Sequence, residues 1–151
     1  MKSSWRTVSW VLGLGWAASL ALPVATFGTG EGEMWSGWAV LLLGWLGLFL
    51  GQFAWIANFL FVGALIMLMR GRPPLVWGMM VGVLTSLLAV HALTWTQVIK
   101  TGGATAPVLS YGPGYDLWIA VTFAAGVALC TAALAEIRPS TEARRPSSYT
   151  G

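Results

Sequence analysis

Three polar side chains in otherwise apolar stretches are the residues of this sequence best equipped for chemistry. Gln52 and Asn58 are the only carboxamides in the run Trp35–Met69, and His91 lies within the run Leu75–Ile99. A carboxamide both donates and accepts hydrogen bonds, and a histidine in apolar surroundings can relay a proton or ligate a group. We therefore treat Gln52, Asn58 and His91 as a candidate polar site.

Two interpretations of the carboxamides remain open. In the first, Gln52 and Asn58 hydrogen-bond to neighbouring helices, or to irregular backbone near Gly51, and their role is structural. In the second they form a functional polar site within a membrane. The structural interpretation is favoured, because uncharged amides commonly hold membrane helices together.

His91 has no predicted partner for metal or acid–base chemistry. The chain has one His and one Cys, and its acidic residues lie outside the apolar runs or close to their ends. A metal centre needs several ligands at suitable spacing, so none is predicted. We expect His91 to pack as a neutral ring, with Trp95 one turn further on. Haem bound by His91, with a second ligand from a partner subunit or from Met79 or Met80, is a remaining alternative that a Soret band would test.

No enzyme and no nucleic-acid partner are predicted. The sequence offers no Ser/His/Asp set, no paired carboxylates in a membrane cavity and no phosphate-binding loop. The formal net charge is +3, but the basic residues flank the apolar runs, where they set membrane orientation.

Composition places the chain in the membrane class. Hydrophobic residues make up 57 % of it and charged residues 9 %, whereas about a quarter of a soluble domain is charged. A bilayer-spanning helix takes roughly 20 residues. Four apolar runs have at least that length: Val8–Phe27, Trp35–Met69, Leu75–Ile99 and Tyr115–Ile137. The sequence therefore predicts an all-α membrane protein with four transmembrane helices in one domain, residues 1–137, followed by a disordered cytoplasmic tail, residues 138–151.

The distribution of basic residues predicts the topology. If the long second run crosses once, Lys100 is the only basic residue outside. The positive-inside rule then places both termini in the cytoplasm of a bacterial inner membrane. The surplus of the second run becomes an interfacial or re-entrant half-helix broken near Gly51, where Gln52 could satisfy freed backbone groups. A single tilted helix is the alternative.

The first run also resembles a signal peptide in its basic start, Lys2 and Arg6, and in its apolar core. Ala21 and Ala25 would be the cleavage sites. An uncleaved helix is favoured, because the core is long for a signal peptide and contains tryptophans.

Small residues on the predicted helices indicate close packing. GLFLG (47–51) and GMMVG (78–82) fit the small-xxx-small pattern, which lets membrane helices approach closely. Six glycines are expected at helix contacts: Gly44, Gly47, Gly51, Gly78, Gly82 and Gly126. The expected partners are the lipid bilayer and either a second copy of the chain or another membrane protein.

The turn before the last run, SYGPGYDLW (110–118), is the most distinctive local feature. It combines a rigid Gly-Pro-Gly turn, an acidic first helical turn and aromatic anchors for the headgroup level. The alternative is an outer-face docking turn. Its residues would be Tyr111, Gly112, Pro113, Gly114, Tyr115, Asp116 and Trp118.

Three segments carry a resemblance. GWAVLLLGWLGL, FAWIAN and YGPGYDLWIA together resemble uncharacterised small bacterial inner-membrane proteins with a YGPGYxLW-type turn, over most of residues 36–125. The resemblance implies a multi-helix membrane fold and no established activity or cofactor. The tryptophan-rich translocator family has similar length, but the order of its motifs differs and its fifth helix is missing here.

Two functional classes follow. The first is a non-catalytic accessory or scaffold subunit that packs with itself or with a larger membrane complex. The second is a small homo-oligomeric transporter or channel that uses Gln52, Asn58 and His91, although the sequence shows no internal repeat. Loss of a solute flux in Gln52→Leu and Asn58→Leu variants that still assemble would select the second.

Overall fold

The computed structural model describes residues 2–28, 32–71, 73–99 and 103–136. The predicted tail, residues 138–151, lies outside this part of the chain. The α-helices are α1 (Lys2–Ala21), α2 (Gly37–Leu43), α3 (Ala57–Arg70), α4 (Leu75–His91) and α5 (Pro113–Ala135). The strands are β1 (Pro23–Phe27), β2 (Glu33–Ser36), β3 (Gln97–Ile99) and β4 (Thr105–Tyr111). The short 3₁₀ segments are η1 (Gly44–Leu50), η2 (Ala54–Ile56) and η3 (Ala92–Thr94).

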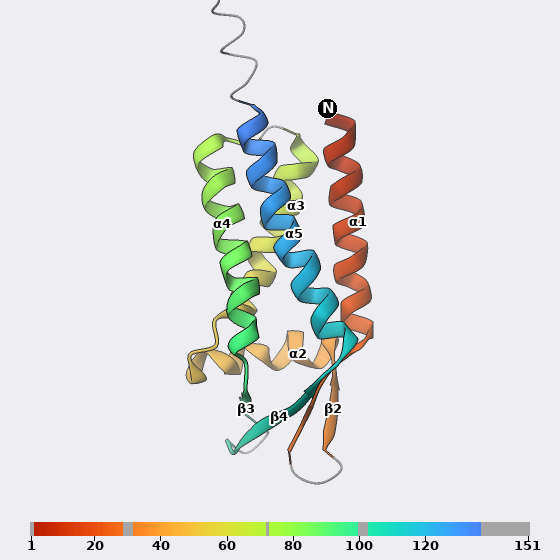
Figure 1. Ribbon diagram of the computed structural model, residues 1–151, viewed down its shortest axis with the longest axis vertical. Helices are drawn as coiled ribbons and strands as arrows, with labels where there is room; N and C mark the ends of the chain where they lie inside the picture. Colours follow the sequence, from red (N-terminus) through yellow and green to blue (C-terminus); the bar gives the residue numbers. More distant parts are fainter. Residues whose placement is uncertain (1, 29–31, 72, 100–102, 137–151) are drawn as a thin grey trace, which may run out of the picture.

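Four long helices form the body of the molecule. Helices α1, α3, α4 and α5 run along the long axis as a bundle, and α2 lies across one end of it (Figure 1). The sheet projects beyond α2. We call this the sheet end and the opposite end of the bundle the far end.

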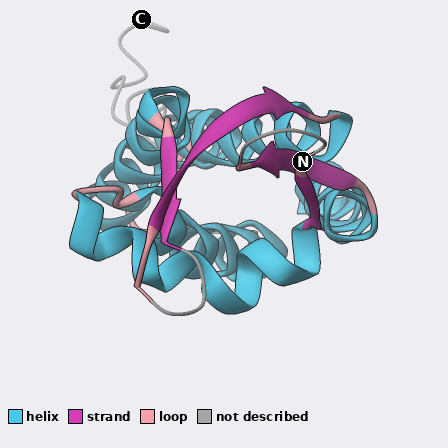
Figure 2. Ribbon diagram, turned by 90° about the horizontal axis from the view of Figure 1, so that it is seen from below, coloured by secondary structure: helices cyan, strands magenta, loops and turns pink. Residues whose placement is uncertain are grey.

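The sheet is antiparallel throughout, with strand order β2-β1-β4-β3. Thr26 in the central strand β1 pairs with Met34 of β2 on one side and with Ser110 of β4 on the other. Seen from below, at the same end of the molecule as α2, the strands curve along the side that faces α2 instead of forming a flat layer (Figure 2). The sheet therefore covers the end of the bundle together with α2.

The predicted all-α fold with four transmembrane helices is wrong. The residues of β1 were expected to end the first transmembrane helix, and those of β3 to end the third. The residues of β4 lie between the third and fourth apolar runs, where no regular element was predicted. Pro23 explains the first error, because proline ends a helix at the residues before it, and β-branched and aromatic side chains then favour a strand. Short apolar strands cannot be told from helix by hydropathy alone.

The second run is not one helix. It contains Trp35 and Ser36 of β2, then α2, η1, η2 and α3. Gly51, the predicted position of the bend, caps η1 with a left-handed φ of 73°. Glycine adopts this conformation without the steric cost that a side chain brings.

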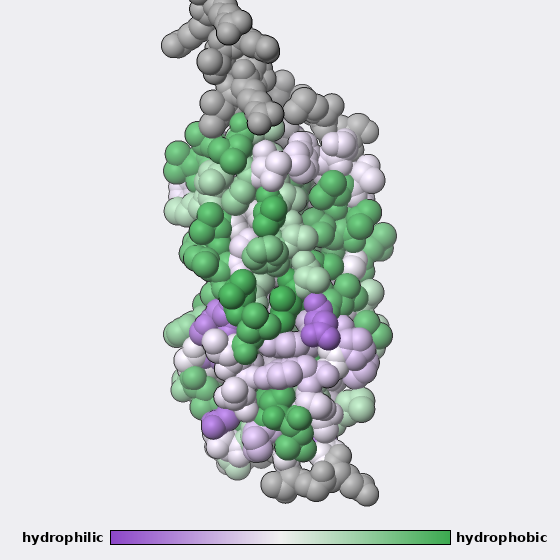
Figure 3. Space-filling view, in the orientation of Figure 1, coloured by the Kyte–Doolittle hydropathy of each residue, from purple (hydrophilic) through white to green (hydrophobic). Residues whose placement is uncertain are grey.

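In the described part of the chain, two helical segments are long and apolar enough to cross a membrane, Leu75–Thr94 and Pro113–Ala135. Four were expected. Helix α3 falls short because the irregular η2 precedes it and Gly71 ends it, and α1 opens with the polar stretch KSSWRTVS. Apolar side chains dominate the bundle surface, while polar ones gather around the sheet end (Figure 3).

Helices α4 and α5 pack closely through glycines. A Cβ at Gly82 would lie 2.7 Å from the Gly126 carbonyl oxygen, and one at Gly126 would meet the Gly82 carbonyl in turn. A Cβ at Gly78 would lie 2.9 Å from the Ala133 Cβ. These three glycines occupy the helix contacts that small-residue spacing predicts.

Candidate functional site: a cavity between the bundle and the sheet

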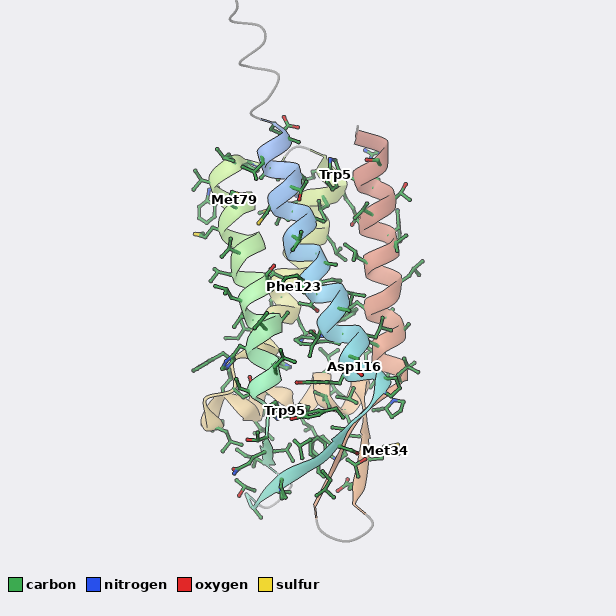
Figure 4. All side chains as sticks on the ribbon, viewed as in Figure 1. Trp5, Met34, Met79, Trp95, Asp116 and Phe123 are labelled. Atoms are coloured by element: carbon green, nitrogen blue, oxygen red, sulfur yellow. The ribbon has the colours of Figure 1, made fainter. Side chains whose placement is uncertain are left out.

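The site is a hollow where the bundle meets the sheet and α2. It contains about 770 Å³ of empty space, part of which opens to the outside. Its walls come from the end of α1, α2 with η1, the start of α3, the segment after α4, and the start of α5. Trp95 lies at this junction, whereas Trp5 and Met79 lie at the far end (Figure 4). We call the hollow the sheet-end cavity.

Aromatic and aliphatic side chains make most of the cavity wall. Four aromatic rings line it: Trp55, Trp95, Tyr115 and Trp118. Its polar side chains are those of Ser19, Gln52, Asn58 and Gln97, besides the Tyr115 hydroxyl and the indole N–H groups. None of the lining residues is charged. The cavity is therefore suited to an uncharged, largely apolar molecule, because burying an unpaired charge there would be costly.

Asn58 links three helices at the cavity wall. Its Oδ1 accepts the indole N–H of Trp16 from α1 at 3.1 Å and that of Trp118 from α5 at 2.9 Å. Its Nδ2 donates to the Trp55 carbonyl oxygen at 3.0 Å. An indole nitrogen only donates, so the two tryptophans fix which end of the carboxamide is oxygen. The second Nδ2 hydrogen has no partner among the described residues.

Gln52 is held more loosely. Its Nε2 donates to the Thr94 hydroxyl at 3.4 Å, and its Oε1 accepts from the Ala54 N–H at 3.4 Å. Both distances are long for hydrogen bonds, so this amide can exchange its partners at small cost. The structure thus places two of the three predicted polar residues, Gln52 and Asn58, on the same cavity.

His91 does not line the cavity. Its Nε2 lies 3.3 Å from the Gly51 carbonyl oxygen, and its ring stacks on Phe53 with centroids 6.1 Å apart. Trp95, one turn further on, packs edge-on against Phe27, with ring centroids 5.4 Å apart. His91 therefore docks the loop at Gly51 onto the end of α4.

Haem ligation by His91 together with a Met of the same chain does not fit this geometry. Met79 and Met80 lie on α4 itself, about 18 and 16 Å along the helix from His91 at 1.5 Å per residue. Within the described residues, no group of three or more His, Cys, Asp and Glu side chains could hold a metal ion.

Two aromatic side chains of the turn at 110–118, Tyr115 and Trp118, point inward. Tyr115 is 6 % exposed and donates its hydroxyl hydrogen to the Ala92 carbonyl oxygen at 2.7 Å, and Trp118 turns to Asn58. They were expected to face the lipid headgroups. Gly112 fits tightly against Pro23, and its N–H donates to the Val24 carbonyl oxygen at 2.8 Å. The part of the predicted docking surface that stays exposed is Tyr111, Pro113 and Asp116.

Tyr111 fastens the sheet to the end of α4. Its hydroxyl donates to the Trp95 carbonyl oxygen, and its ring stacks on Tyr115 with centroids 4.5 Å apart. Burial raises the pKa of the Tyr111 hydroxyl above its usual value, because the charged form loses hydration. The hydroxyl therefore remains a donor.

Three predicted packing glycines serve the cavity region instead of helix contacts. A Cβ at Gly44 would lie 2.7 Å from Trp55 Cδ1, and one at Gly47 would lie 3.3 Å from Gln52 Cβ. Nothing lies within 4 Å of a Cβ built at Gly51, which acts as a turn residue. Gly44 and Gly47 thus make room for the side chains that form the cavity wall.

Three tryptophans of the site were not predicted from the sequence: Trp16, Trp55 and Trp95. A signal was present in the abundance of tryptophan near the carboxamides, since an indole N–H in apolar surroundings needs an acceptor. Sequence spacing alone could not pair Trp16 with Asn58, because they are 42 residues apart. Comparison of the chain with protein-family models, curated proteins and solved structures gave no match.

Proposed function

We propose that this protein is a non-catalytic accessory protein of a cytoplasmic membrane, and that it uses the sheet-end cavity to bind a small lipid-soluble molecule. The observation that carries the proposal is the cavity itself, an uncharged hollow with aromatic walls at one end of an apolar bundle. Binding sites for small molecules commonly combine such walls with a few polar groups.

The surface supports embedding of the bundle in a bilayer. Many large apolar side chains on the bundle are exposed, among them Val11 at 63 %, Phe59 at 62 % and Val76 at 72 %. A soluble monomer rarely leaves so much apolar surface uncovered, whereas lipid tails would cover it. The apolar belt stops near the sheet end, where polar residues begin (Figure 3).

The charged residues at the two ends of the bundle support one orientation of the protein in the membrane. At the far end, Arg6 donates to the Met69 carbonyl oxygen at 3.3 Å, and Arg70 ends α3. At the sheet end, Glu33 lies in β2 and Asp116 in the first turn of α5. By the positive-inside rule, we assign the far end to the cytoplasmic side and the cavity to the outer side.

The packed core of the bundle favours a protein that binds a small molecule over a transporter or channel that lets a solute pass. Beyond Asn58, the side chains of Phe61, Leu68 and Leu129 are 0 % exposed and fill the interior between the helices. Trp16 stacks on Phe61, with centroids 5.9 Å apart. A conduit would need open space along this axis, which these side chains fill, so a transporter or channel is the weaker candidate.

Native mass spectrometry after gentle extraction from the native membrane tests the proposal. We expect a lipid-soluble molecule to leave with the protein, either alone or with companion subunits. Two neighbouring leucines give a matched pair of variants, because Leu41 lines the cavity whereas Leu42 is 68 % exposed. Leu41→Trp fills the cavity and should lose the molecule, while Leu42→Trp should keep it. Equal occupancy in the two variants would contradict binding in the cavity.

A further inference from the structure

Building on the proposed role of the cavity, we infer the chemical class of its ligand: an uncharged amphiphile with a planar ring and a carbonyl acceptor. Three features of the wall lead there. They are the aromatic rings, the hydrogen-bond donors that lack a full set of partners among the described residues, and the absence of charge among the lining residues.

The aromatic faces favour a planar head. Trp55, Trp95 and Trp118 come from three separate segments and line one hollow with Tyr115. Rings bind rings through offset or edge-on contacts, which contribute beyond the area they bury. A saturated chain gains the burial but not these contacts.

Donors that lack a full set of partners favour an acceptor on the ligand. Asn58 keeps one Nδ2 hydrogen without a partner, and Trp95 Nε1 has none among the residues that the structure describes. Gln52 Nε2 adds a donor that is held only by a 3.4 Å contact. The Asn58 oxygen is already taken by two indoles, whereas the side-chain oxygens of Gln97 and Ser19 remain as acceptors on the wall. A carbonyl oxygen on the ligand would accept from the donors named above.

The lack of charge excludes the ionised relatives of such a ligand. A carboxylate or ammonium head would enter an uncharged wall with no counter-ion among its lining residues. Desolvation of an unpaired ion costs far more than the available neutral hydrogen bonds return. A cation would gain from the indole faces, but the wall has no carboxylate to pair with it.

Four matched probes test the inference on the full chain in lipid nanodiscs. They are para-hexylacetophenone, para-hexylethylbenzene, para-hexylbenzoate and a straight-chain methyl ketone of the same carbon number as the first. The bound fraction is measured by native mass spectrometry and referred to the probe content of empty nanodiscs. We expect para-hexylacetophenone to bind roughly two- to tenfold tighter than para-hexylethylbenzene, which is the value of one neutral hydrogen bond. The other two should bind more weakly than para-hexylacetophenone.

Two variants locate the donors. Gln52→Leu removes a carboxamide and Trp95→Phe removes an indole N–H, and both keep an apolar or aromatic wall, so each should lower the ketone-to-hydrocarbon ratio. The ratio stays meaningful even if a variant alters the cavity, because both probes sense the same change. Asn58 is left intact because it links three helices.

The outcomes separate the ligand class from the role of the cavity. If para-hexylacetophenone and para-hexylethylbenzene bind equally, and Leu41→Trp abolishes the binding of both, the cavity binds lipid-soluble molecules but the assignment of a carbonyl group to the ligand is wrong. Tightest binding of the benzoate or of the chain ketone would also overturn the assignment. If no probe binds the wild-type chain, or if the Leu41→Trp and Leu42→Trp variants bind all probes equally, both the ligand class and the proposed function are contradicted.

Discussion

Replacing Asn58 with leucine tests whether the carboxamide holds the bundle together at the cavity. Leucine is similar in size to asparagine but provides no acceptor. Asn58→Leu therefore leaves the indole N–H groups of Trp16 and Trp118 without the oxygen that binds them at 3.1 and 2.9 Å. Both groups are half-buried, so water replaces the lost acceptor only in part.

The expected loss follows mainly from the two broken interhelical bonds, because the third, from Asn58 Nδ2 to the Trp55 carbonyl oxygen, is local and spans three residues. Interhelical hydrogen bonds in membrane proteins average about 0.6 kcal/mol, which sets the lower end of the range at about 1 kcal/mol for two. Leaving a buried donor unpaired costs about 1–3 kcal/mol, and partial exposure keeps each indole near the lower end of that range. We expect the free energy of unfolding to fall by about 1–4 kcal/mol.

The measurement is reversible unfolding of the purified protein in mixed micelles of increasing SDS fraction, followed by circular dichroism. Trp16→Phe and Trp118→Phe each remove one donor and complete double-mutant cycles with Asn58→Leu. In each cycle, the two changes together should cost less than the sum of the single ones. Phe59→Leu is the control, because Phe59 is 62 % exposed and neighbours Asn58.

A small effect would refute this account of Asn58. If Asn58→Leu lies within about 0.5 kcal/mol of the wild type, as surface changes do, the bonds contribute no net stability. If the changes are additive in both cycles, the indoles and the carboxamide do not act together, whatever the size of the single effects.

Three further predictions concern the backbone and the sheet. Gly82→Ala should destabilise the protein by about 1–3 kcal/mol in the same SDS assay, because its Cβ would lie 2.7 Å from the Gly126 carbonyl oxygen. Gly63→Ala, in an open position within α3, should instead stabilise the protein by about 0.5–1 kcal/mol. If Gly82→Ala and Gly63→Ala change the free energy of unfolding equally, close α4–α5 packing is contradicted. Gly51→Ala should lower the free energy of unfolding by about 1–2 kcal/mol, because Gly51 has a left-handed φ of 73° that alanine adopts at a cost. Gly51→Asn should lower it less, and equal losses in the two variants would mean that the turn changes its conformation. The pKa of Tyr111 is raised in the folded state, so its contribution to stability is present below pH 10 and is lost as pH rises through the folded-state pKa. Tyr111→Phe should therefore flatten the decline of unfolding free energy measured above pH 10, and an unchanged decline would contradict this assignment.

The sequence contained the local signals of the fold. The Pro-Pro pair before Leu75 marks the start of α4, and Gly51 marks the place where the second run breaks. The spacing of Gly78 and Gly82 anticipated their contact with α5. Each of these features depends on a residue and its chain neighbours, or on a helical repeat.

The sheet needed information that local patterns do not contain. Strand β1 pairs with β4, more than 80 residues further along the chain, so its hydrogen-bond partners are invisible in either segment alone. Pro23–Phe27 and Gln97–Ile99 are short, apolar and continuous with helical runs, and a hydropathy reading therefore merged them into helices. Thr105–Tyr111 contains a proline and follows glycines, which favoured a loop.

The same non-local pairing reverses the direction of the aromatic side chains near the sheet. An amphipathic aromatic residue at a helix end is expected at the lipid headgroups, since its polar tip needs a wet or polar partner. Here the sheet and α2 cover the end of the bundle and supply those partners inside, the Ala92 carbonyl oxygen for Tyr115 and the Asn58 oxygen for Trp118. Once both tips are satisfied internally, the flat faces of these rings become cavity walls. The Asn58 oxygen is occupied by the indoles of Trp16 and Trp118, which leaves one N–H of the carboxamide without a partner among the described residues. Under the proposed function, the structural and the functional role of Asn58 are therefore compatible, because the bonds that fix its oxygen leave this N–H for a ligand.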